Sequence, residues 1–179
     1  MTVTIEPAAA LAAPLEALKT YLAISLDDED DALTGLIRAA SEVAERYLGQ
    51  LLIARAVTQT LGVRSGWQRL AIRPVTGITA VDGLPADGAA FPLPVESYAV
   101  DIDAGGTGHI RISTPGAAGR VRVRYTAGLA NDADAVPDAI RHGIIRLAGE
   151  YHARREGLEP DPPASVTALW RPWRRVQLA

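Results

Sequence analysis

The segment from Asp27 to Leu52, DDEDDALTGLIRAASEVAERYLGQLL, is the part of the chain around which the rest must pack. Its apolar residues recur every three or four positions for about five turns, which is the spacing of one buried helical face. These residues are Leu33, Leu36, Ile37, Ala40, Val43, Ala44, Tyr47, Leu48 and Leu51. We therefore expect a long amphipathic helix whose apolar side faces the core of a small bundle.

This helix is preceded by five consecutive acids: Asp27, Asp28, Glu29, Asp30 and Asp31. The helix dipole favours negative charge at this end, and Asp27 or Asp28 can cap the first free N–H groups. Capping and solubility are one interpretation of the run. The other is that the acids line a channel and repel a polyanion that passes through it without binding.

The composition is that of a folded protein that can bury a core within one domain. The chain has 179 residues, 48% of them hydrophobic and 22% charged. It contains no cysteine, which excludes disulfides and thiolate metal sites, and its net charge is −3. The N-terminus lacks the basic start and apolar run of a secretion signal, and no apolar run is long enough to span a bilayer. We therefore expect a protein of the cytoplasm, or of a particle assembled there.

The hydrophobic period changes twice along the chain, which predicts an α+β fold. A loose, alanine-rich arm up to Ala13 should lead into a helical hairpin over residues 14–52. Alternating β-branched residues then predict an antiparallel β insert over 54–126. A helix predicted over 137–156 should pack on the Asp27–Leu52 helix and complete a small bundle. Strands are expected at 54–63, 69–72, 75–81, 98–102, 109–113 and 120–125, the last two paired as a hairpin. We expect a single domain over 1–179: a small helical bundle with an inserted antiparallel β module and an extended C-terminal tail over 159–179.

Residues that could support catalysis are few. His109, His142 and His152 lack the spacing of a metal site, and no nucleophile motif is present. The glycine-rich segment 105–108 lacks the Lys-Ser/Thr ending of a phosphate loop and precedes a predicted strand, so it is read as a turn. We expect no enzymatic activity, no cofactor and no metal.

Two further patterns each have two interpretations. The alternating run Arg120-Val-Arg-Val-Arg124 is typical of the solvent face of a strand, with a nucleic-acid contact as the alternative. Trp67 lies in a predicted turn, where it is a candidate for a subunit interface or for core packing.

The C-terminal segment combines aromatic and basic residues. Trp170 and Trp173 are interleaved with Arg171, Arg174 and Arg175, which is the composition of an interface anchor. The alternative is that this tail folds back on its own domain.

The order of these features resembles the head–tail connector (adaptor) proteins of long-tailed phages, prophages and gene transfer agents. The resemblance extends from Leu15 to Leu178 and rests on four short motifs. They are VRYTAG at 123–128, VPDAI at 136–140, EYHARRE at 150–156 and LWRPWRRV at 169–176.

The resemblance implies a structural virion protein of the head–tail neck, assembled in the bacterial cytoplasm. Such a protein forms a ring of twelve copies beneath the portal and extends the DNA channel, through which DNA passes without specific binding. Its partners would be the portal protein, the next tail-side connector (stopper) or tail protein, and copies of itself, with no membrane contact. The alternatives are a small nucleic-acid-binding module that uses the Arg120–Arg124 strand, or an uncharacterised enzyme. The residues expected to bind the portal are Leu169, Trp170, Arg171, Trp173, Arg174, Arg175, Val176 and Leu178.

Overall fold

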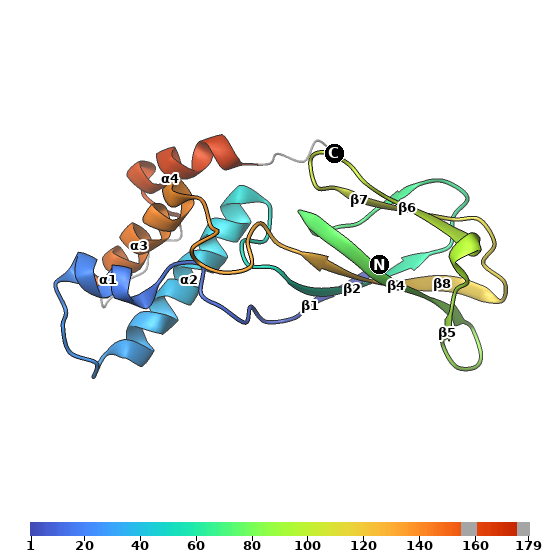
Figure 1. The fold of residues 1–179 in the computed structure, drawn as a ribbon, viewed down its shortest axis with the longest axis horizontal. Coiled ribbons are helices and arrows are strands. Elements are labelled where there is room, and N and C mark those ends of the chain that lie inside the picture. The colour runs from blue at the N-terminus through green and yellow to red at the C-terminus, as the bar shows by residue number, and fades with distance from the viewer. Residues whose placement is uncertain (155–160, 175–179) are drawn as a thin grey trace. The chain divides into compact units, whose positions relative to one another are not determined.

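The computed structural model describes residues 1–154 and 161–174 and contains two compact units (Figure 1). The β unit comprises residues 1–7 and 54–128, and the helical unit comprises residues 8–53 and 129–179. All the pairings between the named strands are antiparallel, so the predicted α+β class is confirmed.

The helical unit is built around the long helix predicted from the sequence. Its helices are α1 (Leu15–Leu22), α2 (Asp30–Leu48), α3 (Asp138–Ala153) and α4 (Ala164–Trp170). The buried residues of α2 are Leu33, Ile37, Ala40, Ala44 and Leu48, as its period predicts, and they share one core with apolar residues of α3. The helix ends at Gly49, whose φ of 68° is the left-handed conformation that glycine adopts without strain.

Helix α4 is attached to this core by Trp170, which is fully buried. Its indole Nε1 donates a hydrogen bond to the carbonyl of Ile140 at 3.2 Å, and its ring centre lies 5.8 Å from that of Tyr47. The ring packs directly on Gly143, where an added Cβ would overlap the indole. The indole can therefore pack here only because residue 143 is a glycine.

The expected extended tail is wrong for residues 164–170, which are helical. Pro163 lies directly before this helix: it is extended (φ −54°, ψ 151°), and its carbonyl accepts the first backbone bonds of α4. Proline is compatible with a helix start because its missing N–H has no role there. Burial of the Trp170 indole then stabilises the docked helix.

A buried lysine connects α1 to the start of α2. The Lys19 side chain is 5% exposed, and its Nζ donates to Asp27 at 2.5 Å and to Asp30 at 2.8 Å. The hydrogen bond from Lys19 holds the pKa of Asp27 below its ordinary value, and the two carboxylates raise the pKa of Lys19. The expected capping by Asp27 or Asp28 is wrong, since Glu29 is the N-cap and no side chain caps α2. Water can satisfy exposed N–H groups at a helix start, whereas a buried ammonium needs carboxylates.

The β unit contains two sheets. The five-stranded sheet has the order β1 (Thr2–Ile5), β2 (Arg55–Gly62), β8 (Ala118–Ala127), β4 (Val75–Pro85) and β5 (Phe91–Pro92). The three-stranded sheet has the order β3 (Gln68–Arg69), β7 (Gly108–Ile112) and β6 (Tyr98–Ile102). A short 3₁₀ turn over Val95–Ser97 leads into β6, and β3 is shorter than the strand expected at 69–72.

One face of β2 and β8 forms the buried interior of the β unit. It contributes Val57, Gln59, Leu61, Val121, Val123 and Tyr125. The hydroxyl of Tyr125 donates to Oε1 of Gln59 at 3.0 Å, and the same oxygen accepts the N–H of Ala71 at 2.9 Å. Burial raises the pKa of Tyr125 to about 12. The polar side chains of this interior are therefore hydrogen-bonded to one another and to the backbone.

The expected hairpin between residues 109–113 and 120–125 is wrong. Strand β7 pairs with β3 and β6, whereas β8 pairs with β2 and β4 in the other sheet. The N–H groups of Ser113 and Thr114 both donate to the carbonyl of Ser97, which continues β7 along β6. Strand β8 has two long neighbours that cover both of its edges, and these pairings replace the local hairpin.

The N-terminal arm is also more ordered than expected. Residues Thr2–Ile5 form β1 and pair with β2, with Thr2 opposite Thr60 and Ile5 opposite Val57. The segment alternates threonine with β-branched apolar residues, a composition that favours strands. The edge of β2 supplies the hydrogen-bonding partners.

We predict that Trp170→Ala destabilises the protein by about 3–5 kcal/mol, because it removes a fully buried indole and leaves a cavity. Urea unfolding followed by far-UV circular dichroism measures the loss. The matched control is Trp173→Ala, which removes a side chain with 38% exposure and should cost about 1 kcal/mol or less. Equal losses in the two variants would contradict the assignment of Trp170 to the core.

We also predict that acid destabilises the wild type more steeply than Lys19→Met. Because Lys19 lowers the pKa of Asp27, the stabilisation from this pair is complete above the ordinary pKa of about 4 and is lost as pH falls through the lowered value. The raised pKa of Lys19 keeps the ammonium charged over this whole range. Urea midpoints measured at pH 6, 5, 4 and 3 give the comparison, with exposed Arg38→Met as the control that should follow the wild type. If the urea midpoints of the wild type and Lys19→Met fell in parallel with pH, the prediction would be refuted.

Candidate functional site

The end of the described chain presents aromatic and basic side chains beside helix α2. After Trp170 the chain makes a 3₁₀ turn over Arg171–Trp173. The side chain of Gln50 donates to the carbonyl of Trp173 at 3.2 Å, and the guanidinium of Arg174 lies 5.2 Å from the ring centre of Tyr47. These two contacts hold the turn against the end of α2, and Arg171, Trp173 and Arg174 remain exposed there.

The structure divides the eight predicted docking residues into three groups. Trp170 is a core residue, so its prediction as an anchor for a partner is wrong, and Leu169 is partly buried against the same core. Arg171, Trp173 and Arg174 lie together on the exposed turn. Arg175, Val176 and Leu178 lie outside the described residues.

A signal in the sequence could have distinguished the two tryptophans. Val166 and Trp170 are four residues apart, and both are buried on one face of α4. This spacing is the ordinary helical one, whereas Trp173 is separated from it by Pro172. The proline-rich flank of this segment concealed a helix of only seven residues.

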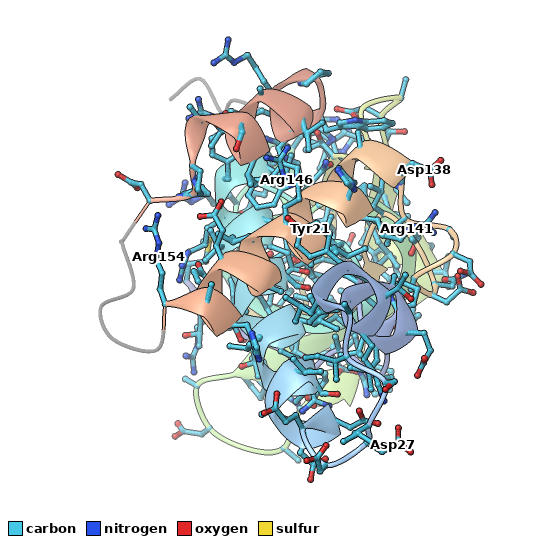
Figure 2. The ribbon with its side chains drawn as sticks, turned by 90° about the vertical axis from the view of Figure 1, so that its left-hand side faces the viewer. Tyr21, Asp27, Asp138, Arg141, Arg146 and Arg154 are labelled. Atoms are coloured by element: carbon cyan, nitrogen blue, oxygen red, sulfur yellow. The ribbon has the colours of Figure 1, made fainter. Side chains whose placement is uncertain are left out.

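The five acids at the start of α2, residues 27–31, form a surface that is only partly neutralised. Asp27 and Asp30 bind Lys19, and Oε2 of Glu29 lies 3.2 Å from Nε2 of His152. Figure 2 shows Asp27 at the corner between α1 and α2. Asp28 and Asp31 are exposed and have no ion-pair partner among the described residues. Asp28 and Asp31 therefore leave negative charge on this surface.

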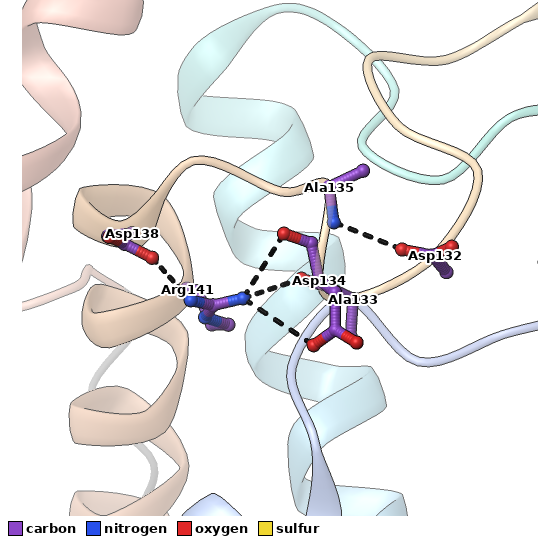
Figure 3. A network of polar contacts seen from close by, with 6 residues as sticks. All are labelled: Asp132, Ala133, Asp134, Ala135, Asp138 and Arg141. Atoms are coloured by element: carbon purple, nitrogen blue, oxygen red, sulfur yellow. Dashed lines mark hydrogen bonds and ion pairs between the residues drawn. The ribbon is translucent and has the colours of Figure 1, made fainter.

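The loop before α3, which sequence reasoning missed, is a second acidic surface (Figure 3). Arg141 donates to the carbonyls of Ala133 at 3.0 Å and Asp134 at 3.4 Å, and it pairs with the carboxylate of Asp138. A carboxylate oxygen of Asp132 accepts the N–H of Ala135 at 3.0 Å. The side chains of Asp134 and Asp138 are 94% and 90% exposed. We name residues 132–138 the acidic loop; Arg141 fixes its backbone while its carboxylates remain in solvent.

The β unit carries a basic surface. Arg120, Arg122 and Arg124 alternate with the buried residues Val121, Val123 and Tyr125, so they share the outer face of β8, as predicted. Arg124 forms two hydrogen bonds with the Asp82 carboxylate, at 3.0 and 3.1 Å. We name the outer surface around these three arginines the arginine face.

Trp67, the predicted interface candidate, is 48% exposed, and the guanidinium of Arg111 lies 5.1 Å from its ring centre. A cation over an indole face is a favourable contact, but it leaves about half of the indole in solvent. Trp67 is therefore available on the surface of the β unit.

The glycine-rich segment 105–108 is a turn whose N–H groups are satisfied internally. The carboxylate of Asp103 accepts the N–H groups of Gly105 at 2.8 Å and Thr107 at 2.9 Å. The bond from Thr107 is the main reason that the pKa of Asp103 lies below its ordinary value. These N–H groups are directed to a carboxylate of the same loop and not to a ligand.

Within residues 1–154 and 161–174, no three His, Asp or Glu side chains are arranged to hold a metal ion. No helix in this part of the chain is both long and apolar enough to cross a membrane.

Comparison with solved structures finds full-length matches in particles of gene transfer agents (GTA). A chain from the "neck of empty GTA particle computed with C6 symmetry" matches with a TM-score of 0.80 and 25% identity, covering 100% of this chain and 98% of that one. A chain from the "virion of native gene transfer agent (GTA) particle" matches with a TM-score of 0.76 and 26% identity, over the same shares. A chain from the "neck of native GTA particle computed with C12 symmetry" has a TM-score of 0.74 and 26% identity, again over the same shares. No curated protein matches the sequence.

The family comparison agrees with these structures. The model of the family described as "Head completion protein" matches residues 14–158, which is most of the chain. This match and the neck structures confirm the resemblance to connector proteins of phages and gene transfer agents. The chain belongs to the head completion protein family.

Proposed function

We propose that this protein is a subunit of the ring that connects head and tail in the neck of a phage-like particle. The observation that carries the proposal is the match over the whole chain, with a TM-score of 0.80, to a chain of a GTA neck. A ring of twelve copies is compatible with both symmetries, C6 and C12, named for the matching particles. The ring would lie beneath the portal, extend the DNA channel, and contact a stopper or tail protein on its other side.

The proposed role is structural and needs no catalysis. The family match is to a head completion protein, and the polar clusters of the described residues have structural explanations. Arg141 orders a loop, Lys19 links two helices, and Asp103 closes a turn. The ring performs its function through the surfaces that it presents to neighbouring proteins and to DNA.

We assign portal binding to the exposed turn at the end of the described chain. Trp173 offers an indole of which more than a third is exposed, and Arg171 and Arg174 flank it. Tryptophan and arginine are the residues most enriched at the energetic centres of interfaces, and arginine can bind a carboxylate with two hydrogen bonds. Leu169 would support the turn from the core side, and residues 175–179 follow directly in sequence.

We assign the channel surface to the five acids at the start of α2, residues 27–31. Asp28 and Asp31 are the exposed members without an ion pair among the described residues, and Asp27, Glu29 and Asp30 add charge that Lys19 and His152 partly offset. A negative wall opposes adsorption of DNA within about 10 Å at 0.1 M salt. DNA could then move through the ring without being retained.

Deletion of the gene in cells that produce the particle tests the connector role. We expect DNA-filled heads without tails, counted by negative-stain electron microscopy, and recovery of tailed particles when the wild-type gene is restored. The physical reason is that no other contact would join the portal to the tail. Normal numbers of tailed particles in the deletion strain would overturn the connector role.

Complementation with Arg171→Ala/Trp173→Ala tests the docking surface. We expect tailed particles to fall by about tenfold or more, since loss of an anchor tryptophan commonly costs about 2 kcal/mol. The matched control is Arg38→Ala/Leu26→Ala, which removes an exposed arginine and an exposed apolar side chain elsewhere on the helical unit and should complement fully. Full complementation by the docking variant, with a folded protein, would reject this surface and leave the connector role standing.

A further inference from the structure

The outer face of the five-stranded sheet is basic around β8. The strand register places Thr58, Thr60 and Gly62 of β2 beside the arginines of β8, and Ala80, Asp82 and Leu84 of β4 on their other side. Thr2 and Thr4 of β1 continue the same face, opposite Thr60 and Thr58. These neighbours are short or uncharged except for Asp82, so the arginine side chains stand above the surface around them.

Two of the three arginines have no carboxylate partner. Asp82 is engaged by Arg124, whose side chain is 52% exposed. Arg120 and Arg122 form no ion pair with any described residue. A guanidinium presents a planar fork of donors that fits a carboxylate, so this face is suited to an acidic partner.

The two units of the chain carry charge of opposite sign. The β unit has eight arginines and no lysine against six acids, which gives a net charge of +2 with neutral histidines. The helical unit has ten basic residues against fifteen acids, which gives −5. Together these values equal the −3 of the whole chain. A second copy of the chain therefore offers the arginine face an acidic partner.

Within the helical unit, the acidic loop is the surface that best complements the arginine face. Its three carboxylates are those of Asp132, Asp134 and Asp138. Only Asp134 and Asp138 pair with the single guanidinium of Arg141, and both of these side chains are at least 90% exposed. Hydrogen bonds from Arg141 to the carbonyls of Ala133 and Asp134 fix the backbone of the loop. An ordered surface loses less conformational freedom when it binds.

We infer that the arginine face of one subunit binds the acidic loop of the next subunit. The inference rests on the proposed function, because it describes a contact within the proposed ring. The two surfaces differ, so the contact is heterologous and propagates head to tail, as a closed ring requires. DNA is the alternative partner for the arginine face, because it is a polyanion. The −5 charge of the helical unit in the same chain repels DNA, which favours the acidic loop as the partner.

A charge exchange between the two surfaces tests the contact. One variant, Arg120→Glu/Arg122→Gln, reverses the arginine face while leaving the Arg124–Asp82 pair intact. The other, Asp134→Lys/Asp138→Asn, reverses the acidic loop and retains the Asp132 hydrogen bond to Ala135. Each variant alone should reduce tailed particles about tenfold or more in the deletion strain, since like charges then meet at every interface.

Co-expression of the two variants should restore tailed particles to near the wild-type number. An alternating ring places each reversed face against an oppositely charged neighbour, so every interface again pairs unlike charges. The control, Arg38→Glu, makes a comparable change of charge away from both surfaces and should complement alone. Both variants should keep the wild-type thermal midpoint within about 4 °C, which shows that they fold.

Co-expression that restores no tailed particles would overturn the contact. Normal particle numbers from either variant alone would also overturn the contact.

DNA binding is a separate outcome of the same test. If the arginine-face variant forms normal particles, but the purified variant no longer shows salt-sensitive binding to double-stranded DNA, then DNA is the partner and the inference is wrong. If deletion of the wild-type gene has no effect on particles, the proposed function fails, and sedimentation of the two purified variants, mixed and separate, still tests the contact. A mixture that sediments no faster than either variant alone would then refute it.

Discussion

The packing of the Trp170 indole against Gly143 is the constraint on which the surface of the helical unit depends. The indole donates to the Ile140 carbonyl and contacts Tyr47, so one side chain joins α4 to both α2 and α3. A Cβ at position 143 would occupy the volume of the indole. The exposed turn that follows, Arg171–Trp173, is positioned by this buried contact and by the bond from Gln50. A core contact thereby determines which aromatic and basic side chains a partner can meet.

In the β unit, strand β8 links core packing to surface charge, as Trp170 links core packing to the exposed turn in the helical unit. It pairs with β2 and β4, its inward residues fill the interior of the β unit, and its outward residues form the arginine face. Because successive side chains of a strand point to opposite faces, the same ten residues both fill the core and present charge to solvent. A shift of register by one residue would bury the arginines, so burial of Val121, Val123 and Tyr125 also fixes where the basic surface lies.

The acids of the helical unit combine structural and surface roles. Asp27 and Asp30 neutralise the buried Lys19 and so fix α1 against α2, while Asp28 and Asp31 stay in solvent. In the acidic loop, Arg141 orders the backbone and only partly offsets three carboxylates. In both places a basic residue holds neighbouring segments in position, and carboxylates remain exposed. Surfaces of this kind suit the roles proposed above, in lining a DNA channel and in contacts between neighbouring copies.

Local patterns in the amino-acid sequence were enough to predict the types of secondary structure and most of their positions. The period of Leu33, Ile37, Ala40, Ala44 and Leu48 predicted α2, and the alternation along β2, β6 and β8 predicted those strands, because both patterns are local. It also placed Arg120, Arg122 and Arg124 on one face. The motifs between Leu15 and Leu178 were sufficient to indicate the family.

Which segments pack or pair with one another depends on the folded chain and could not be predicted from local patterns. Strands β7 and β8 are adjacent in sequence but lie in different sheets, and Thr2–Ile5 is a strand because a distant edge is available to it. Trp170 and Trp173 look alike in the sequence; Gly143 leaves room for the first, and nothing buries the second to the same extent. Likewise, the acids before α2 could have capped its N–H groups, but Lys19 in α1 required two of them. The periodicity of hydrophobic residues indicates only whether a segment forms a helix or a strand. Burial and strand pairing depend on residues that are far away in the chain.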